Sequence, residues 1–89
     1  MASYSARIKK SAARELADLP RKDQERVIER IRGLANNPRP PGAEKLAGSD
    51  DKFRLRQGNY RILYAIEDDV LMVYVVKMVT GKMSIADVS

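Results

Sequence analysis

The run from Lys52 to Tyr64 constrains the fold of this chain more than any other segment. At its centre lies Gly58-Asn59, two residues that tolerate the positive φ angles of tight hairpin turns. Strand-forming residues flank this pair on both sides, so the run predicts an antiparallel β-hairpin. Counting outward from the turn pairs Gln57 with Tyr60, Arg56 with Arg61, Leu55 with Ile62, Arg54 with Leu63, and Phe53 with Tyr64.

The two faces of the predicted hairpin differ in chemistry, because side chains alternate along a strand. One face is apolar and is expected to join the core; it carries Phe53, Leu55, Ile62 and Tyr64. The other face gathers Arg54, Arg56 and Arg61. Like charges directly across a strand pair cost about 0.2 to 1 kcal/mol. A sheet that holds them together is expected to meet a polyanion.

The alternative is that these arginines only keep the protein soluble. Surfaces that serve solubility normally mix both signs of charge. The two hairpin strands carry an acid only at their far end, Glu67, so the functional interpretation is favoured. The whole chain has 17 Lys and Arg against 12 Asp and Glu, a formal net charge of +5. This balance favours nucleic acid, an acidic protein partner, or both.

The chain contains neither cysteine nor histidine. Their absence excludes disulfides, thiolate chemistry and Ser/His/Asp or Cys/His nucleophilic arrangements. No metal and no cofactor are expected, and any chemistry must come from Arg, Lys, Tyr or carboxylates. Met1 to Ile8 lacks an apolar signal core, and the longest apolar run, Val70 to Val76, is too short for a membrane span. A cytoplasmic protein without a membrane partner is therefore expected.

The order of elements predicts one α+β domain over residues 1–89. Ser3 to Ile8 predicts a short strand, and Lys9 to Leu19 and Arg21 to Asn37 predict a helical hairpin with apolar residues at helical spacing. The proline-rich stretch Asn36 to Gly42 predicts a loop. Glu44 to Asp51 is expected to be a second connector, with Leu46 inserted into the core.

A third strand is expected over Val70 to Met78 after a turn at Asp68-Asp69. Counting from that turn pairs Ile66 with Leu71, Tyr64 with Val73, and Ile62 with Val75. The predicted fold is a small antiparallel sheet of three or four strands with the helical hairpin packed on one face. The opposite face would carry apolar residues beside the arginines, covered by a partner segment or by the chain's own C-terminal tail. These residues are Leu63, Ala65, Met72, Tyr74 and Val76.

This order of elements resembles the RelE/ParE superfamily of bacterial toxins over about residues 3 to 77. The resemblance rests on Lys45-Leu46-Ala47-Gly48, on Phe53-Arg54-Leu55-Arg56, and on the segment Gly58 to Tyr64. An acidic turn and a valine-rich strand ending in Lys77 follow. RelE-like members cut mRNA in the ribosomal A site without a metal and are neutralised by a cognate antitoxin. The resemblance implies the same fold and partners here.

The resemblance also implies site residues. Arg54 and Arg56 take the positions of a catalytic basic pair, and Arg61 takes that of the phosphate-stabilising arginine. In this chemistry a ribose 2′-hydroxyl attacks the adjacent phosphate. Guanidinium is a poor proton acceptor, so the arginines are expected to neutralise charge and to orient phosphate. Lys52 and Tyr60 are the nearby groups that could transfer a proton; the alternative is that each only packs or is solvated. The expected RNA-binding residues are Lys45, Lys52, Tyr60 and Lys77.

The C-terminal segment 78–89 departs from the family pattern. RelE-like chains usually continue with a segment resembling Lys-Val-Gly-His-Arg-x-x-Val-Tyr-Arg, whereas the sequence from Lys77 to Ser89 has no His, Arg or Tyr. We hypothesise that a frameshift accounts for this difference. Met78 to Asp87 can be encoded by ATG GTC ACC GGC AAG ATG TCT ATC GCT GAT, which gives Gly-His-Arg-Gln-Asp-Val-Tyr-Arg and a stop when read two nucleotides on. Such a tail, whether a strand or disordered, would weaken catalysis.

Three functions therefore stay open. The first is a RelE-type endoribonuclease, weakened or inactive in this chain. The second is a ParE-like inhibitor of DNA gyrase that performs no chemistry, and the third is an inert decoy that binds antitoxin. The basic strand with Arg54 and Arg56 and the adjacent Tyr60-Arg61 favour the first, because phosphate-handling arginines have no evident use in clamping a protein.

Overall fold

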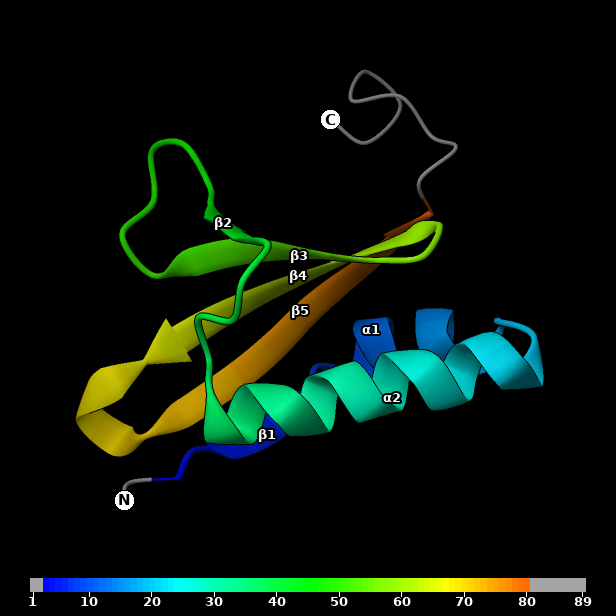
Figure 1. Cartoon of the computed structure of the whole chain (residues 1–89), viewed down its shortest axis with the longest axis horizontal. Helices are drawn as coiled ribbons and strands as arrows, with labels where there is room; N and C mark the ends of the chain where they lie inside the picture. The colour runs from blue at the N-terminus through cyan, green and yellow to red at the C-terminus, as the bar shows by residue number, and fades with distance from the viewer. Residues whose placement is uncertain (1–2, 81–89) are drawn as a thin grey trace.

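Two helices lie on one side of a five-stranded sheet in the computed structural model, which describes residues 3–80 (Figure 1). Within that range, neither helix is long and apolar enough to cross a membrane. The elements in chain order are β1 (Ser5–Ile8), α1 (Lys10–Ala17), α2 (Arg21–Asn36), β2 (Ala43–Lys45), β3 (Lys52–Gln57), β4 (Tyr60–Glu67), the 3-10 turn η1 (Asp68–Val70) and β5 (Met72–Thr80).

The strand order in the sheet is β1-β5-β4-β3-β2. β1 runs parallel to β5, and every other neighbouring pair is antiparallel. The predicted α+β fold is confirmed, but the sheet has five strands instead of three or four. The additional strand is β2, which lies within the region predicted as a connector and pairs Glu44 with Arg54 of β3.

The predicted register of the β3–β4 hairpin is confirmed at every pair, from Gln57–Tyr60 to Phe53–Tyr64. The predicted β4–β5 register is wrong by two residues, because Ile66 pairs with Val73 and Tyr64 with Val75. The connection is longer than a two-residue turn: η1 occupies it, and Leu71 follows with a left-handed φ of 51°. A shift of two preserves the faces. Beyond a bulge at Leu63/Tyr64, Ile62 pairs with Met78, not with Val75.

The core lies between the helices and the sheet. Tyr64 is fully buried there, stacks on Phe53 with ring centroids 5.9 Å apart, and donates its hydroxyl hydrogen to the Pro38 carbonyl oxygen at 2.8 Å. Leu46, expected in the core, lies outside it and is partly exposed, because it follows the edge strand β2. The buried cluster is Ala12, Leu16, Val27, Ile31, Leu34, Phe53, Leu55, Ile62, Tyr64, Ile66, Val73, Val75 and Met78.

An ion-paired cluster joins the β4–β5 turn to the amino terminus and to the proline-rich loop. Asp68 accepts a hydrogen bond from the Tyr4 hydroxyl at 2.6 Å and forms an ion pair with Arg39 at 2.9 Å. The Arg39 guanidinium also lies 5.4 Å from the centroid of the Phe53 ring. Hydrogen bonding from Arg39, and then from Tyr4, lowers the pKa of Asp68. The cluster therefore fixes the loop before β2 against the end of the sheet.

The sheet face opposite the helices is called the open face here. The predicted mixture of basic and apolar side chains on it is confirmed by the strand register. Tyr74 is 37% exposed, and Leu63, Ala65, Met72 and Val76 are partly exposed. The tail was predicted to begin at residue 78, but Met78 to Thr80 belong to β5. The predicted cover of the open face by the rest of the tail, residues 81–89, lies outside the described residues.

Candidate nucleic-acid interface

Arg56 and Arg61 are direct cross-strand partners on the open face. Arg56 is exposed and Arg61 is half-buried. Within residues 3–80, neither guanidinium forms an ion pair with a carboxylate. Opposed strand residues have Cα atoms about 4.5 to 5.5 Å apart, so both guanidinium groups can reach one phosphate or two neighbouring phosphates. The predicted pairing of these two arginines is confirmed.

Arg54 lies on the same face but in a different electrostatic environment. Its Nη2 atom is 2.5 Å from Oε2 of Glu44, the residue opposite it on β2. The side chains of Arg54 and Glu44 are 37% and 65% exposed, so water screens the pair. Sequence reasoning missed Glu44, because β2 is too short and too polar to be recognised as a strand. Arg54 is therefore a neutralised cation at the border of the Arg56/Arg61 pair.

The expected RNA-binding lysines do not gather at one place. Lys52 is exposed and shares the open face with the arginines. Lys45 lies opposite Phe53, on the other face of the sheet, and its Nζ atom is 3.7 Å from a carboxylate oxygen of Asp50. Lys77 extends to the helix α1, where its Nζ atom is 3.4 Å from Oε2 of Glu15. Of the three lysines, only Lys52 lies in position to share a ligand with the arginines.

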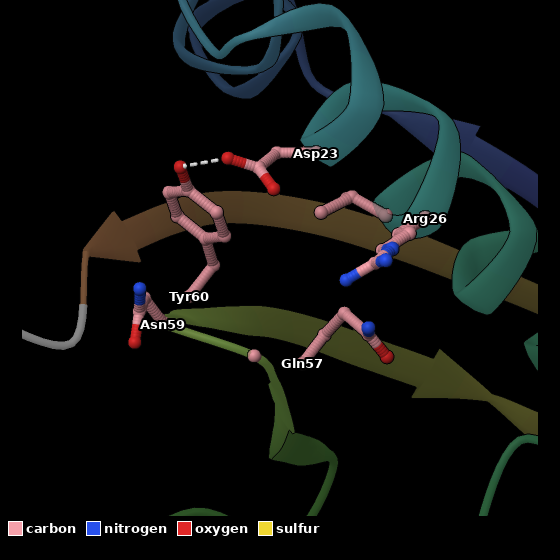
Figure 2. Close-up of a pocket in the computed structure, with 7 residues that line it drawn as sticks. Asp23, Arg26, Gln57, Asn59 and Tyr60 are labelled. Carbon is pink, nitrogen blue, oxygen red and sulfur yellow. Dashed lines mark hydrogen bonds between the residues drawn. The ribbon is translucent and has the colours of Figure 1, made fainter.

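Tyr60 lies on the helix side of the sheet and not beside the arginines. Its hydroxyl donates a hydrogen bond to Oδ2 of Asp23 on α2 at 2.8 Å (Figure 2). This hydrogen bond and burial raise the pKa of Tyr60. A phenol with a raised pKa releases its proton less readily, and this one points away from the open face. The alternation of Tyr60 with Ile62 and Tyr64 along β4 is the sequence signal for this orientation.

A small pocket separates the first turns of α2 from the β3–β4 turn. Figure 2 shows Asp23 and Arg26 on the helix side, with Gln57, Asn59 and Tyr60 on the hairpin side. Its volume is about 130 Å³. Pockets that enclose small organic ligands usually measure about 300 to 1,000 Å³. The pocket is therefore smaller than such ligand sites, and it lies where the Tyr60–Asp23 hydrogen bond joins the hairpin to α2.

Glu15 of α1 holds the outer edge of β5. The pairing of β1 with β5 ends at Ile8–Val75, so the edge beyond this point has no strand partner within the described range. Oε1 of Glu15 accepts a hydrogen bond from the backbone N–H of Met78 at 3.3 Å, while Oε2 contacts Lys77. No sequence pattern predicts this contact. It fixes the part of β5 in which Val79 pairs with Arg61.

The chemistry available on the open face is charge neutralisation. Among residues 3–80, no cluster of three or more Asp or Glu side chains is placed to hold a metal ion. Guanidinium groups cannot lose their protons near neutral pH, but they stabilise negative charge that develops on a phosphate. The arrangement therefore suits a phosphodiester ligand.

Comparisons with known proteins agree with this description. The family model of the ParE toxin of the type II toxin-antitoxin system parDE matches residues 6–85. A RelE-like toxin protein of Escherichia coli is 30% identical over 87 residues, which cover 96% of this chain and 88% of that protein. Both matches span nearly the whole chain.

Solved structures give the same result. The chain is similar to the RelBE2 toxin-antitoxin complex of Mycobacterium tuberculosis, with a TM-score of 0.80, 29% identity, and coverage of 90% of this chain and 93% of that one. It is also similar to the archaeal RelE-RelB complex of Pyrococcus horikoshii, with a TM-score of 0.83, 25% identity, and coverage of 92% and 99%. The resemblance seen in the hairpin and its flanking segments is confirmed: the chain belongs to the RelE/ParE superfamily of type II toxin-antitoxin toxins, as a RelE-like toxin.

Proposed function

We propose that the open face binds mRNA in the ribosomal A site and that the ancestral activity of this toxin is metal-independent RNA cleavage. The observation that carries the proposal is the Arg56/Arg61 pair, two cations held opposite each other with no carboxylate partner within residues 3–80. Such a pair costs free energy unless an anion lies between the two charges. A phosphodiester supplies that anion.

In the proposed reaction a ribose 2′-oxygen attacks the adjacent phosphorus atom, and the bond from phosphorus to the 5′-oxygen breaks. The products are a 2′,3′-cyclic phosphate and a 5′-hydroxyl, so the 2′-hydroxyl proton is lost and the leaving oxygen gains one. Arg56 and Arg61 would stabilise the extra negative charge of the transition state. Arg54 would join them when phosphate displaces Glu44, since an exposed ion pair contributes only about 0 to 1 kcal/mol.

Proton transfer is the step of the proposed reaction that the side chains of the open face support least. Tyr60 points to the other face of the sheet, where Asp23 binds its hydroxyl. The family's His, Arg and Tyr are absent from the sequence after Lys77. We therefore infer that cleavage by this chain is weak or lost, and that a frameshift within the codons of residues 78–87 replaced the family segment. Sequencing the gene tests this, because codons incompatible with the string given above would exclude the frameshift.

Cleavage itself is tested by primer-extension mapping of mRNA in a purified translation system. The chain is compared with a version in which Gly-His-Arg-Gln-Asp-Val-Tyr-Arg replaces the residues from Met78 onward. Cleavage by the restored version alone would support a ribonuclease inactivated at its C-terminus. Cleavage by both would assign sufficient chemistry to the open face.

A second candidate is ParE-like inhibition of DNA gyrase, and the observation that favours it is the match to the ParE family model. The two functions leave different products. If the restored version produces gyrase-trapped DNA breaks and no mRNA cleavage, gyrase inhibition replaces the ribonuclease proposal. The absence of both products would leave an antitoxin-binding decoy.

We also propose that the chain binds a cognate antitoxin, which all three functions share. The related toxins of Mycobacterium tuberculosis and Pyrococcus horikoshii were solved in complex with their RelB partners. An acidic, partly disordered chain would lay a helix or a strand over the helices and the open face, because the toxin carries a net charge of +5. Failure of the purified toxin to bind the product of the neighbouring gene at micromolar concentration would refute this.

A further inference from the structure

A row of four residues crosses the open face away from the Arg56/Arg61 pair. Lys52 of β3 pairs with Ala65 of β4, Ala65 pairs with Tyr74 of β5, and Tyr74 pairs with Arg7 of β1. Paired residues point to the same face, so the four side chains form one transverse line, called the Tyr74 row here. An aromatic ring lies inside this row, and a cation lies at each end.

The members of the Tyr74 row are available to a ligand within the described part of the chain. Arg7 and Lys52 are exposed, and Tyr74 is one of the three exposed large apolar side chains of residues 3–80, with 37% of its surface accessible. In the same range neither cation has a carboxylate partner. Neighbouring strands lie about 4.8 Å apart, so Arg7 adjoins the ring, while the small Ala65 leaves space between the ring and Lys52.

Carboxylates border the row but do not neutralise it. Glu67 lies on the same face in the next row, opposite Met72, and forms no ion pair with residues 3–80. Glu44 is engaged by Arg54. Within residues 3–80, an exposed ring thus lies between two cations that form no ion pair. Proteins hold single-stranded nucleic acid in a similar way, with bases stacked on aromatic rings and cations along the phosphates.

We propose that the Tyr74 row is a second RNA-binding site, in which a base stacks on Tyr74 while Arg7 and Lys52 contact the flanking phosphates. This inference rests on the proposed function, since it takes single-stranded RNA as the ligand. The inference adds the path that the single-stranded RNA takes over the sheet. Ala65 is four residues from Arg61 along β4, about 13 Å, a distance that a few nucleotides span.

The test is the affinity of the purified chain for a fluorescently labelled single-stranded RNA oligonucleotide, measured by anisotropy over a series of salt concentrations. Tyr74→Leu keeps an apolar side chain but removes the ring, and we expect it to weaken binding about 10-fold. Tyr74→Phe keeps the ring and should bind like the parent. Arg7→Gln should reduce the salt slope by about 0.7, the value for one lost contact to a single strand. Arg32→Gln, an exposed position of α2, is the matched control for charge.

Circular dichroism establishes that each variant is folded. The proposal is overturned if Tyr74→Leu binds RNA as tightly as the parent, or if the parent binds no RNA at low salt. It is also overturned if Tyr74→Leu weakens only antitoxin binding, which would assign the row to a protein. These outcomes are separate from the cleavage assay. A restored chain that binds RNA through Tyr74 without cutting mRNA would contradict the proposed function and leave the row intact.

Discussion

Arg56 and Arg61 face each other across the β3–β4 ladder without a carboxylate partner in residues 3–80, whereas Arg54, two positions from Arg56, is held by Glu44 at 2.5 Å. The three arginines that look equivalent in the sequence therefore differ in electrostatic environment. The charges of Arg56 and Arg61 are available to a ligand without displacing a carboxylate of residues 3–80. Arg54 must first exchange its carboxylate partner for a phosphate.

Removing the Glu44 charge should strengthen RNA binding. Glu44→Gln leaves Arg54 without an anionic partner, so we expect tighter binding of single-stranded RNA and a salt slope larger by about 0.7, the value for one added contact. The stability of the protein should change by less than about 1 kcal/mol, because the pair is exposed. Anisotropy titrations measure both quantities. Glu25→Gln, which breaks the exposed Arg21–Glu25 pair on α2, is the control and should leave the salt slope unchanged.

Tyr60→Phe should lower stability without changing RNA binding. The variant loses the hydrogen bond from the hydroxyl to Asp23, and a net loss of about 1 kcal/mol in the free energy of unfolding is expected. Urea denaturation measures this loss. Tyr74→Phe removes a hydroxyl that has no hydrogen-bond partner within residues 3–80 and should unfold like the parent. Weaker RNA binding by Tyr60→Phe would indicate that this phenol contacts the ligand after all.

Acid should destabilise the protein partly through Asp68. Its folded-state pKa lies below the ordinary value of 3.8, mainly because Arg39 donates hydrogen bonds to the carboxylate. The stabilisation is complete above the unfolded-state pKa and is lost as the pH falls through the folded-state pKa. Thermal melts from about pH 7 to pH 2 should therefore fall less steeply for Asp68→Asn than for the parent. Asp69→Asn, at the neighbouring exposed position, should follow the parent, and equal slopes for all three would contradict the assignment.

Glu15 should control how strongly the backbone amides at the end of β5 are protected from hydrogen exchange. Glu15→Ala removes the acceptor of the Met78 N–H, so this amide should exchange with deuterium faster than in the parent. Glu15→Gln keeps an acceptor oxygen and loses only the charge facing Lys77, so most of the protection should remain. Exchange rates by nuclear magnetic resonance distinguish the two variants. Equal exchange in all three proteins would mean that the Glu15 contact does not hold this edge.

The hairpin could be predicted from the sequence residue by residue, because Gly58-Asn59 forms a two-residue turn that determines the register of the flanking strands. The β4–β5 register could not, since two acids and a left-handed Leu71 make a longer connection than the sequence indicates. Alternation still assigned the correct faces, because the error was two residues.

The candidate site was predicted less completely than the fold. The pairing of Arg56 with Arg61 was predicted correctly because alternation and a tight turn determine it. Glu44 was missed because a three-residue polar strand carries no pattern of its own. Arg7 also escaped notice, although its alternation with Ala6 and Ile8 in β1 was a usable signal. Lys45 and Lys77 were grouped with the arginines by resemblance, whereas their positions depend on contacts with Asp50 and Glu15 that only the folded chain reveals.

The most direct test of the central claim is the rate of mRNA cleavage by the tail-restored chain with and without Arg61. If the Arg56/Arg61 pair stabilises the charge of the transition state, Arg61→Ala should raise the barrier by about 2 to 4 kcal/mol, a loss of about 30- to 1,000-fold in rate. Arg32→Ala carries the same charge change on α2 and should cut at the parental rate. An unchanged rate for Arg61→Ala would contradict the account and leave the arginine pair a structural feature of the sheet.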